Sequence, residues 1–306
     1  MKKITPLLIA LAFATIQTNA QTTATADTSW KTGGIIGITF NQVSLTNWAA
    51  GGDNSIALNS IFTGFANYKK GKWGWDNGLI LAYGMVQIAK EDLRKNDDRI
   101  ELVSKPGYEF KKNWCISYLF NFRSQFSKGY DYNFDPRVLT SDFLAPAYII
   151  NSLGIEYKPN DNFYFYVSPV TLKTTYINVG NDVIPHLLYG VDSDKTARNE
   201  FGFYLSTRYK KDIMTNVTLF TKLDLFSNYS ENPQNVDVNC ELLLSLKVNK
   251  FITATVGLQA IYDDDTFVPK GKDDNGVPEY GKGLQFKESI GVGLAYNFGK
   301  AELEKK

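Results

Sequence analysis

The sequence is poor in the residues that most often carry catalysis or bind metals: its 306 residues include one histidine, His186, and two cysteines, Cys115 and Cys240. Neither sign of charge dominates, because 33 Lys and Arg stand against 32 Asp and Glu. This balance argues against a nucleic-acid-binding protein, and a content of 43% hydrophobic residues argues against a disordered chain. No apolar run after the N-terminus is long enough for a transmembrane helix. Strands that cross a membrane alternate in polarity, so the mean hydropathy of -0.24 is compatible with a membrane barrel.

The first 20 residues have the pattern of a secretory signal peptide. Lys2 and Lys3 precede an apolar stretch at residues 4–16, and Thr18-Asn19-Ala20 forms a small-x-Ala cleavage site. We predict cleavage before Gln21, which changes the formal charge from +1 to -1 because both lysines leave with the signal. A lipoprotein anchor is not expected, since the residue after the site is not cysteine. The mature chain is expected to work outside the cytoplasm.

From Ile35 onward the main pattern has a period of two, which is typical of strands with one apolar and one polar face. In residues 114–126, Trp114, Ile116, Tyr118 and further aromatics alternate with polar residues. We expect twelve strands, near residues 33–43, 55–68, 73–87, 99–110, 114–126, 143–157, 163–177, 199–209, 217–228, 235–248, 251–263 and 284–298. The faces of the seventh strand stay undecided, because residues 163–166 are all aromatic.

The connections between these segments alternate between short and long. The short ones carry lysine, at Lys69-Lys70-Gly71-Lys72, Lys111-Lys112-Asn113, residues 158–162, Lys210-Lys211 and Asn249-Lys250. The long ones, near 44–54, 88–98, 127–142, 178–198, 229–234 and 264–283, are rich in Gly, Asp, Asn and Pro. Aromatic residues at strand ends predict a girdle at the boundary between water and lipid: Tyr68, Trp73, Trp75, Phe110, Trp114, Tyr157, Tyr209 and Phe298.

These patterns predict an all-β fold, a transmembrane antiparallel up-and-down barrel of about 12 strands spanning residues 33–298. The expected location is the outer membrane, with membrane lipids as partners. An even strand number places residues 21–32 and 299–306 on the periplasmic side. The alternative is a soluble β-sandwich or a lipocalin-like cup. A soluble sheet would have to bury a wide apolar face on every strand, whereas lipid covers the outside of a membrane barrel.

Strand parity assigns the polar residues to the lumen. The residues expected to line it, as determinants of passage or as structural ion pairs, are Arg99, Glu101, Asn121, Arg123, Lys222, Asp224, Asp237, Asn239, Glu241, Lys247 and Lys287. Lys105, Glu109, Glu156 and Arg208 share this face, which then holds seven basic and six acidic residues. Mixed charges favour a paired, structural interior over the single-sign ring of a selective pore. Apolar Leu119, Phe220, Leu243 and Ile261 would partly obstruct the lumen.

The loops contain two features of interest. Asn47, Trp48, Gly51, Gly52 and Asp53 belong to a segment that either folds into the mouth of the barrel or binds a ligand from outside. We favour the inward fold, because the two glycines permit a tight return. The acidic residues Asp263-Asp264-Asp265, with Asp273, Asp274 and Asn275, lack the spacing of an EF-hand, so we expect a solvated loop and no metal site.

Neither the histidine nor the cysteines indicate catalysis. A Ser-His hydrolase would have to use His186, which lies in a loop with no spacing that identifies a partner. Parity directs Cys115 into the lumen and Cys240 toward lipid, so we expect two free thiols although the cell envelope is oxidising. No cofactor motif is present, and we do not expect an enzyme.

Several short motifs occur along the chain as a specific combination: Asn41 to Asp53, Leu225 to Tyr229, Asn235 to Val238, Glu241, Lys247 to Lys250, Ile261 to Asp265 and Leu284 to Glu288. Together they resemble the motifs of a Bacteroidota outer-membrane β-barrel family that is classed as a domain of unknown function. The resemblance implies an outer-membrane barrel in a Gram-negative cell, and it implies no activity or catalytic residue.

Three functions stay open. The first is a porin-like channel or narrow transporter for small solutes. The second is a non-conducting structural or accessory barrel that binds other envelope proteins. The third, less favoured, is an outer-membrane hydrolase that uses His186.

Overall fold

The computed structural model describes residues 29–45, 53–132, 135–178, 186–273 and 277–299. The expected signal peptide, most of the N-terminal segment, the loop residues Asn47, Trp48, Gly51 and Gly52, and the tail from residue 300 lie outside these residues. The described residues form a closed antiparallel barrel of twelve strands, as the sequence predicts. Its strand order is β1-β16-β13-β12-β11-β10-β9-β8-β5-β4-β3-β2. The described residues contain no helix that is long and apolar enough to cross a membrane.

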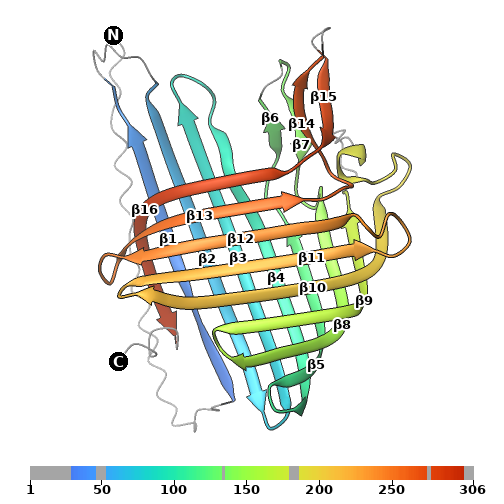
Figure 1. Cartoon of the computed structure of the whole chain (residues 1–306). Coiled ribbons are helices and arrows are strands. Elements are labelled where there is room, and N and C mark those ends of the chain that lie inside the picture. Colours follow the sequence, from blue (N-terminus) through green and yellow to red (C-terminus); the bar gives the residue numbers. More distant parts are fainter. Residues whose placement is uncertain (1–28, 46–52, 133–134, 179–185, 274–276, 300–306) are drawn as a thin grey trace.

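Each predicted strand range overlaps one barrel strand. The barrel strands are β1 (Trp30–Val43), β2 (Ser55–Lys70), β3 (Trp73–Ile88), β4 (Arg94–Lys111), β5 (Trp114–Ser124), β8 (Ala147–Asn160), β9 (Phe163–Tyr176), β10 (Ala197–Met214), β11 (Val217–Asn228), β12 (Val236–Lys247), β13 (Ile252–Tyr262) and β16 (Gln285–Gly299). In Figure 1 the strands on the near side of the barrel cross those on the far side, as expected for a strongly tilted barrel.

One predicted turn is wrong. Lys210 and Lys211 lie within β10 and pair with Phe220 and Leu219 of β11. The strand continues to Met214, and the reversal occurs at residues 215–216. The extension is possible because the hairpin adds a side-chain hydrogen bond from Thr218 to Asp212 beside the ladder. Lysines with long apolar stems can occupy a strand end near water, so they do not by themselves mark a turn.

The structure also decides the faces of β9. Tyr164 and Tyr166 face the lumen, where Tyr166 is fully buried, and Phe163 and Phe165 face outward. A register shift between Leu153 and Ile155 of β8 changes the alternation further along, so that the inward residues after Tyr166 are Ser168, Thr171 and Lys173.

The barrel closes between β1 and β16 through seven residue pairs, from Gly33 with Gly299 to Thr39 with Gly293. Gly34 is required at this seam. A Cβ at this position would lie 2.3 Å from the Thr63 carbonyl oxygen and 2.6 Å from the Phe298 ring. The Phe298 ring instead lies over Gly34 and stacks on Phe62 at a centroid distance of 6.1 Å.

Long connections gather at one end of the barrel and contain small elements of their own. Two hairpins, β6 (Gly129–Asp131) with β7 (Val138–Ser141) and β14 (Phe267–Lys272) with β15 (Pro278–Lys282), project from this end (Figure 1). A short 3-10 turn, η1 (His186–Tyr189), lies in the connection between β9 and β10. Tyr189 donates a hydrogen bond to the Thr140 carbonyl oxygen at 2.6 Å and packs against a buried group of Ala145, Ile177 and Val191. These loops therefore pack on one another at this end, which we call the loop end.

The outer surface of the barrel is apolar. Large hydrophobic side chains on strand after strand point outward and are exposed: Ile36, Ile38, Phe40, Leu58, Leu102, Ile116, Tyr118, Leu153, Ile155, Val170, Leu172, Phe201, Ile290, Val292, Leu294 and Tyr296. All eight residues of the predicted aromatic girdle belong to this outer face. Toward the short turns they form pairs, such as Trp114 with Tyr157 at a ring distance of 4.7 Å. Trp30, Tyr68 and Trp75 form a further group there.

Candidate functional site

Ion pairs that cross the barrel identify its inner face. Lys222 of β11 and Glu101 of β4 are 121 residues apart in sequence, yet the Lys222 Nζ lies 3.3 Å from the Glu101 Oε1. Strands β4 and β11 are not neighbours in the barrel, so the two side chains meet through the lumen. The polar face predicted from strand parity is therefore the inner face.

A first group of charges occupies the middle of the lumen. Lys222 pairs with Glu101, with Asp224 at 3.1 Å and with Glu241 at 3.8 Å. Arg99 lies 3.9 Å from Glu101 and 3.6 Å from Glu241. Lys222, Glu101 and Asp224 are buried. Removing a charge from water without giving it a partner costs on the order of several kcal/mol, so the ion pairs offset this penalty. We call these five residues the central charge group.

A second group lies nearer the short turns. The Nζ of Lys105 lies 2.7 Å from Glu156, and both side chains are buried. Lys158 pairs with Asp76 at 3.0 Å. The Lys105 ammonium also lies over the Tyr164 ring, 3.8 Å from its centroid, which is a cation–π arrangement.

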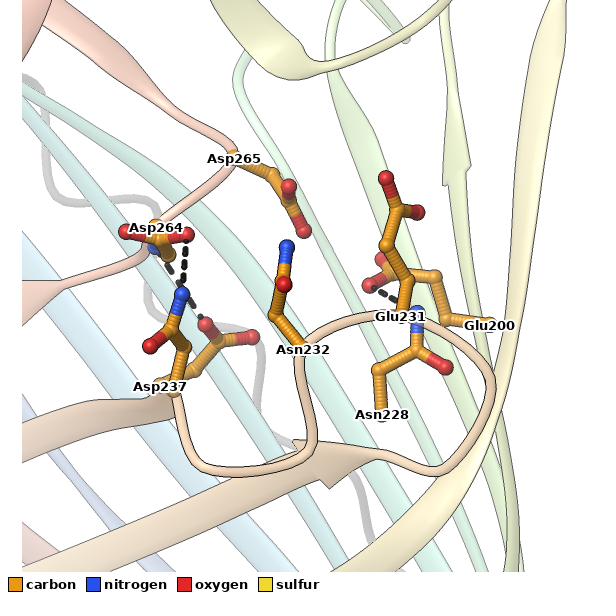
Figure 2. A pocket seen from close by; sticks show the side chains of 8 residues that line it. Glu200, Asn228, Glu231, Asn232, Asp237, Asp264 and Asp265 are labelled. Carbon is orange, nitrogen blue, oxygen red and sulfur yellow. Dashed lines mark hydrogen bonds between the residues drawn. The ribbon is translucent and has the colours of Figure 1, made fainter.

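A third group lies at the loop end. Lys173 contacts Asp237 at 2.6 Å, Asp263 at 3.0 Å and Glu200 at 3.4 Å. Arg198 contacts Asp265 at 2.9 Å and Glu231 at 2.8 Å. Figure 2 shows a small pocket here, with Asp237 and Asp264 on one side and Glu200 and Glu231 on the other.

The acidic loop is held by bases rather than left free. Asp264 accepts hydrogen bonds from Lys282 at 2.8 Å and from Asn235 at 2.7 Å. The hydrogen bond from Lys282 holds the pKa of Asp264 below its usual range. Among the residues that the structure describes, no group of three or more His, Cys, Asp or Glu residues has the geometry of a metal site. Asp274 and Asn275 lie outside the described residues.

Aromatic and apolar side chains fill one side of the lumen. Leu119, Ile150, Tyr166, Tyr204 and Phe226 form a buried cluster, against which Val103 and Tyr164 pack. These residues come from the adjacent strands β5, β8, β9, β10 and β11, with Val103 on β4. Tyr166 donates a hydrogen bond to the Ser152 carbonyl oxygen at 2.9 Å, which satisfies its hydroxyl within the cluster. Leu119 was expected to obstruct the lumen, and it lies in this cluster.

The opposite side of the lumen is open. It is formed by β1, β2, β3, β13 and β16, whose inward positions hold small residues such as Gly37, Gly78, Gly257 and Gly291. A Cβ built at Gly78 would meet no atom within 4 Å. Inward apolar residues are exposed here, such as Ile35 at 41% and Ile61 at 43%, and so is Leu243 at 40% on the adjoining strand β12. Water therefore reaches the lumen wall along this side.

The remaining predicted lumen residues lie on the same inner face. Asn121 contacts Glu101 at 3.4 Å, and Gln259 donates a hydrogen bond to Asn239 at 3.3 Å. Lys287 pairs with Asp97 at 2.8 Å. Lys247 is half-buried near the turn between β12 and β13, and Asp53 is exposed beside the loop end of β2.

Sequence reasoning missed part of the charge network, including Asp76, Lys158, Lys173, Arg198 and Glu200. Asp76 could have been found, since Trp73 and Trp75 face outward and parity then directs Asp76 inward. Lys173 could not be assigned, because the aromatic run 163–166 and the later shift in register hide its face.

The cysteines and the histidine have ordinary surroundings. Cys115 and Cys240 are both free, as expected, and they lie on opposite faces of the wall. The Nδ1 of His186 lies 3.3 Å from the Asp192 carbonyl oxygen. Among the described residues, no serine, threonine or cysteine side chain is hydrogen-bonded to its ring.

Comparison with known proteins gives a family match over part of the chain. Residues 40–130 match a family described as "Protein of unknown function (DUF3078)". This supports the expected resemblance to an uncharacterised family, and the bacterial group stays a prediction. No curated protein sequence matches the chain.

Several solved structures are similar in fold at low identity. An outer membrane channel from Pseudomonas putida F1 has 11% identity and a TM-score of 0.39, over 87% of this chain and 96% of that one. The translocator domain of the autotransporter NalP from Neisseria meningitidis has 11% identity and a TM-score of 0.37, over 89% of each chain. Outer membrane phospholipase A from Escherichia coli has 13% identity and a TM-score of 0.36, over 86% of this chain and 90% of that one. Likeness of this size concerns the fold alone.

Proposed function

We propose that this protein spans the bacterial outer membrane and forms a narrow channel for small solutes. The membrane part of the proposal is supported by the outer surface of the barrel. Soluble monomers rarely expose an apolar patch larger than a few hundred Å², on the order of a single binding site. Here exposed apolar side chains continue around the barrel, and closure leaves no unpaired strand edge. The shortest barrel strands have 11 residues, and a tilted membrane strand needs about 9–11.

The channel part is carried by one observation, the water-exposed side of the lumen. Ile35, Ile61 and Leu243 face inward in a closed barrel and are still about as exposed as outward residues such as Ile36. The aromatic cluster lies on the other side of the lumen, so the open path follows the wall formed by β12, β13, β16, β1, β2 and β3. A path of this kind is narrow and off-centre, with apolar and small residues on one side and paired charges on the other.

A second function is favoured by the filled side of the lumen. The aromatic cluster and the central charge group have the properties of a packed interior, which a non-conducting accessory barrel would need. Such a barrel would act by binding other envelope proteins, and its open wall would be closed by a partner or a loop.

Reconstitution in planar lipid bilayers separates the two functions. The channel predicts stepwise increases in conductance when the folded protein is added, with equal steps because each barrel has one path. Folding of the added protein is checked by its migration on a gel without heating. If folded protein gives no conductance steps, the channel proposal is wrong and the accessory barrel is favoured. Protein that is unfolded before addition serves as the control.

A further inference from the structure

Two arginines in the lumen lack the partners that their neighbours have. Arg123 of β5 and Arg208 of β10 face inward, and the Nε of each is buried without a hydrogen-bond partner. Within the described residues, neither guanidinium forms an ion pair at 4.0 Å or less, whereas Arg99 and Lys222 both do. Leaving a buried donor of a charged group without a hydrogen bond destabilises the folded state. Two such donors in one lumen therefore indicate that a partner from outside the chain can bind there.

Both arginines have common electrostatic partners. Each interacts with the Glu101 and Asp224 carboxylates and with Tyr204. The Cζ of Arg208 lies 5.6 Å from the centroid of the Tyr164 ring, so an aromatic face supports that guanidinium. The two groups therefore border the central charge group from strands β5 and β10.

The carboxylates in this region are already engaged. Glu101 and Asp224 accept contacts from Lys222 at 3.3 and 3.1 Å, and Asp224 also accepts a hydrogen bond from Ser206 at 2.7 Å. With Arg123 and Arg208 added, the region holds four bases, completed by Arg99 and Lys222, against the three acids Glu101, Asp224 and Glu241. Arg208 also interacts electrostatically with Asp76, and the Nε atoms of the two arginines are buried donors without a partner in this region.

We propose that Arg123 and Arg208 form a binding site for a small oxyanion, a carboxylate or a phosphate, within the lumen. A guanidinium presents a planar fork of N–H donors that matches two oxygens of such an anion, and it stays charged at any physiological pH. The two Nε atoms are buried, but the terminal N–H groups of both guanidiniums form no ion pair at 4.0 Å or less among the described residues, so an anion that enters the lumen can bind to them. This site gives the proposed channel its solute class, small anionic solutes, and in that respect it rests on the proposed function.

The site is tested first by binding, which does not depend on conduction. The thermal unfolding midpoint of the folded protein in detergent is measured with potassium phosphate, with potassium acetate, and with potassium chloride at equal ionic strength. A ligand that binds only the folded state raises the midpoint, by about 5 °C at a concentration near 100 times Kd for a chain of this size. The unfolding midpoint is expected to be higher in phosphate or acetate than in chloride. Equal midpoints in all three salts would overturn the proposed binding site.

Variants then locate the effect. Arg123→Gln with Arg208→Gln should abolish the shift, and Lys111→Gln with Lys112→Gln is the matched control, because it removes the same charge from an exposed turn. Arg123→Lys with Arg208→Lys keeps both charges and provides a folded comparison if the glutamine variant does not fold. It should retain less than half of the shift, since an ammonium lacks the fork. An oxyanion shift as large as that of the unchanged protein in either arginine variant would overturn the proposal.

Bilayer recording separates this inference from the proposed function. If oxyanions stabilise the folded protein but no conductance steps occur, the channel is wrong and the site stands. If steps occur but oxyanions stabilise the protein no more than chloride does, the site is wrong and the channel stands.

Discussion

The pair of Lys105 and Glu156 provides the sharpest test that one side of the lumen is a packed interior. Its atoms lie 2.7 Å apart, and the two side chains are only 8% and 5% exposed. Removal of one member of a buried pair leaves an uncompensated charge and typically costs about 3–5 kcal/mol. In Lys105→Met, the hydroxyl of Ser117, at 3.1 Å, is the remaining side-chain partner of Glu156 among the described residues, so we expect the free energy of unfolding to fall by about 4 kcal/mol. Glu156→Leu leaves Lys105 with Asp76 at 3.9 Å, so we expect the free energy of unfolding to fall by about 3 kcal/mol.

The double variant decides between a buried and a solvated pair. Replacement of both members by apolar residues removes both charges, so the expected loss is near 1 kcal/mol rather than the sum of the single losses. With single losses of about 4 and 3 kcal/mol, this corresponds to a coupling energy of about 6 kcal/mol. The assay is equilibrium urea unfolding of the folded protein in lipid vesicles, with each free energy taken from the midpoint and the slope.

The exposed pair of Lys69 and Glu109 is the matched control. Its atoms are 3.1 Å apart, but the lysine side chain is 71% exposed, so its coupling should stay below about 1 kcal/mol. If the Lys105 and Glu156 variants each cost less than about 1 kcal/mol and add within ~0.5 kcal/mol, the lumen is solvated there and the reasoning is refuted.

Three further predictions follow from other parts of the molecule. In intact vesicles a charged, membrane-impermeant maleimide should label Cys115 of the lumen and spare Cys240 of the outer face, and mass spectrometry of the labelled peptides would show the reverse if the faces were exchanged. The hydrogen bond from Lys282 lowers the pKa of Asp264 in the folded state. The stabilisation that results is therefore fully present above the unfolded-state pKa of about 4, and it is lost as the pH falls through the folded-state pKa. The urea midpoint should therefore fall less between pH 5 and about pH 3 in Asp264→Asn than in the unchanged protein, and an equal fall in both would contradict this. Gly34→Ala should destabilise the seam by about 1–3 kcal/mol, because the new Cβ would meet the Thr63 carbonyl oxygen, whereas Gly78→Ala, with no atom within 4 Å, should be close to neutral in the same unfolding assay.

Most of the barrel could be predicted from the sequence, because the pattern that specifies it is local. Period two defines the two faces of a strand, and the alternation of short turns with long loops defines an up-and-down order. Parity failed where the local pattern carries no information, as at Tyr164 and Tyr166 among consecutive aromatics, and where a register shift intervenes, as before Lys173. The turn at Lys210 was misplaced because lysine is compatible with both a turn and a strand end.

Partners across the lumen could not be predicted, because they depend on the diameter, tilt and stagger of the closed barrel. Parity places Lys222, Arg123 and Arg208 on one face, but it does not show that Lys222 reaches Glu101 while the two arginines form no ion pair at 4.0 Å or less among the described residues. The same limit applies to the open wall, since exposure of Ile35 inside the barrel depends on how far the aromatic cluster extends from the other side.

The channel is tested most directly by a tryptophan at two adjacent positions of β1. Ile35 and Ile36 are the same residue type with similar exposure, 41% and 47%, but Ile35 faces the lumen and Ile36 faces outward. In planar bilayers, Ile35→Trp should lower the single-channel conductance by roughly half or more because the larger side chain narrows the open side of the lumen, and Ile36→Trp should leave the conductance unchanged. Equal conductance in both variants and in the unchanged protein would contradict a solute path along this wall.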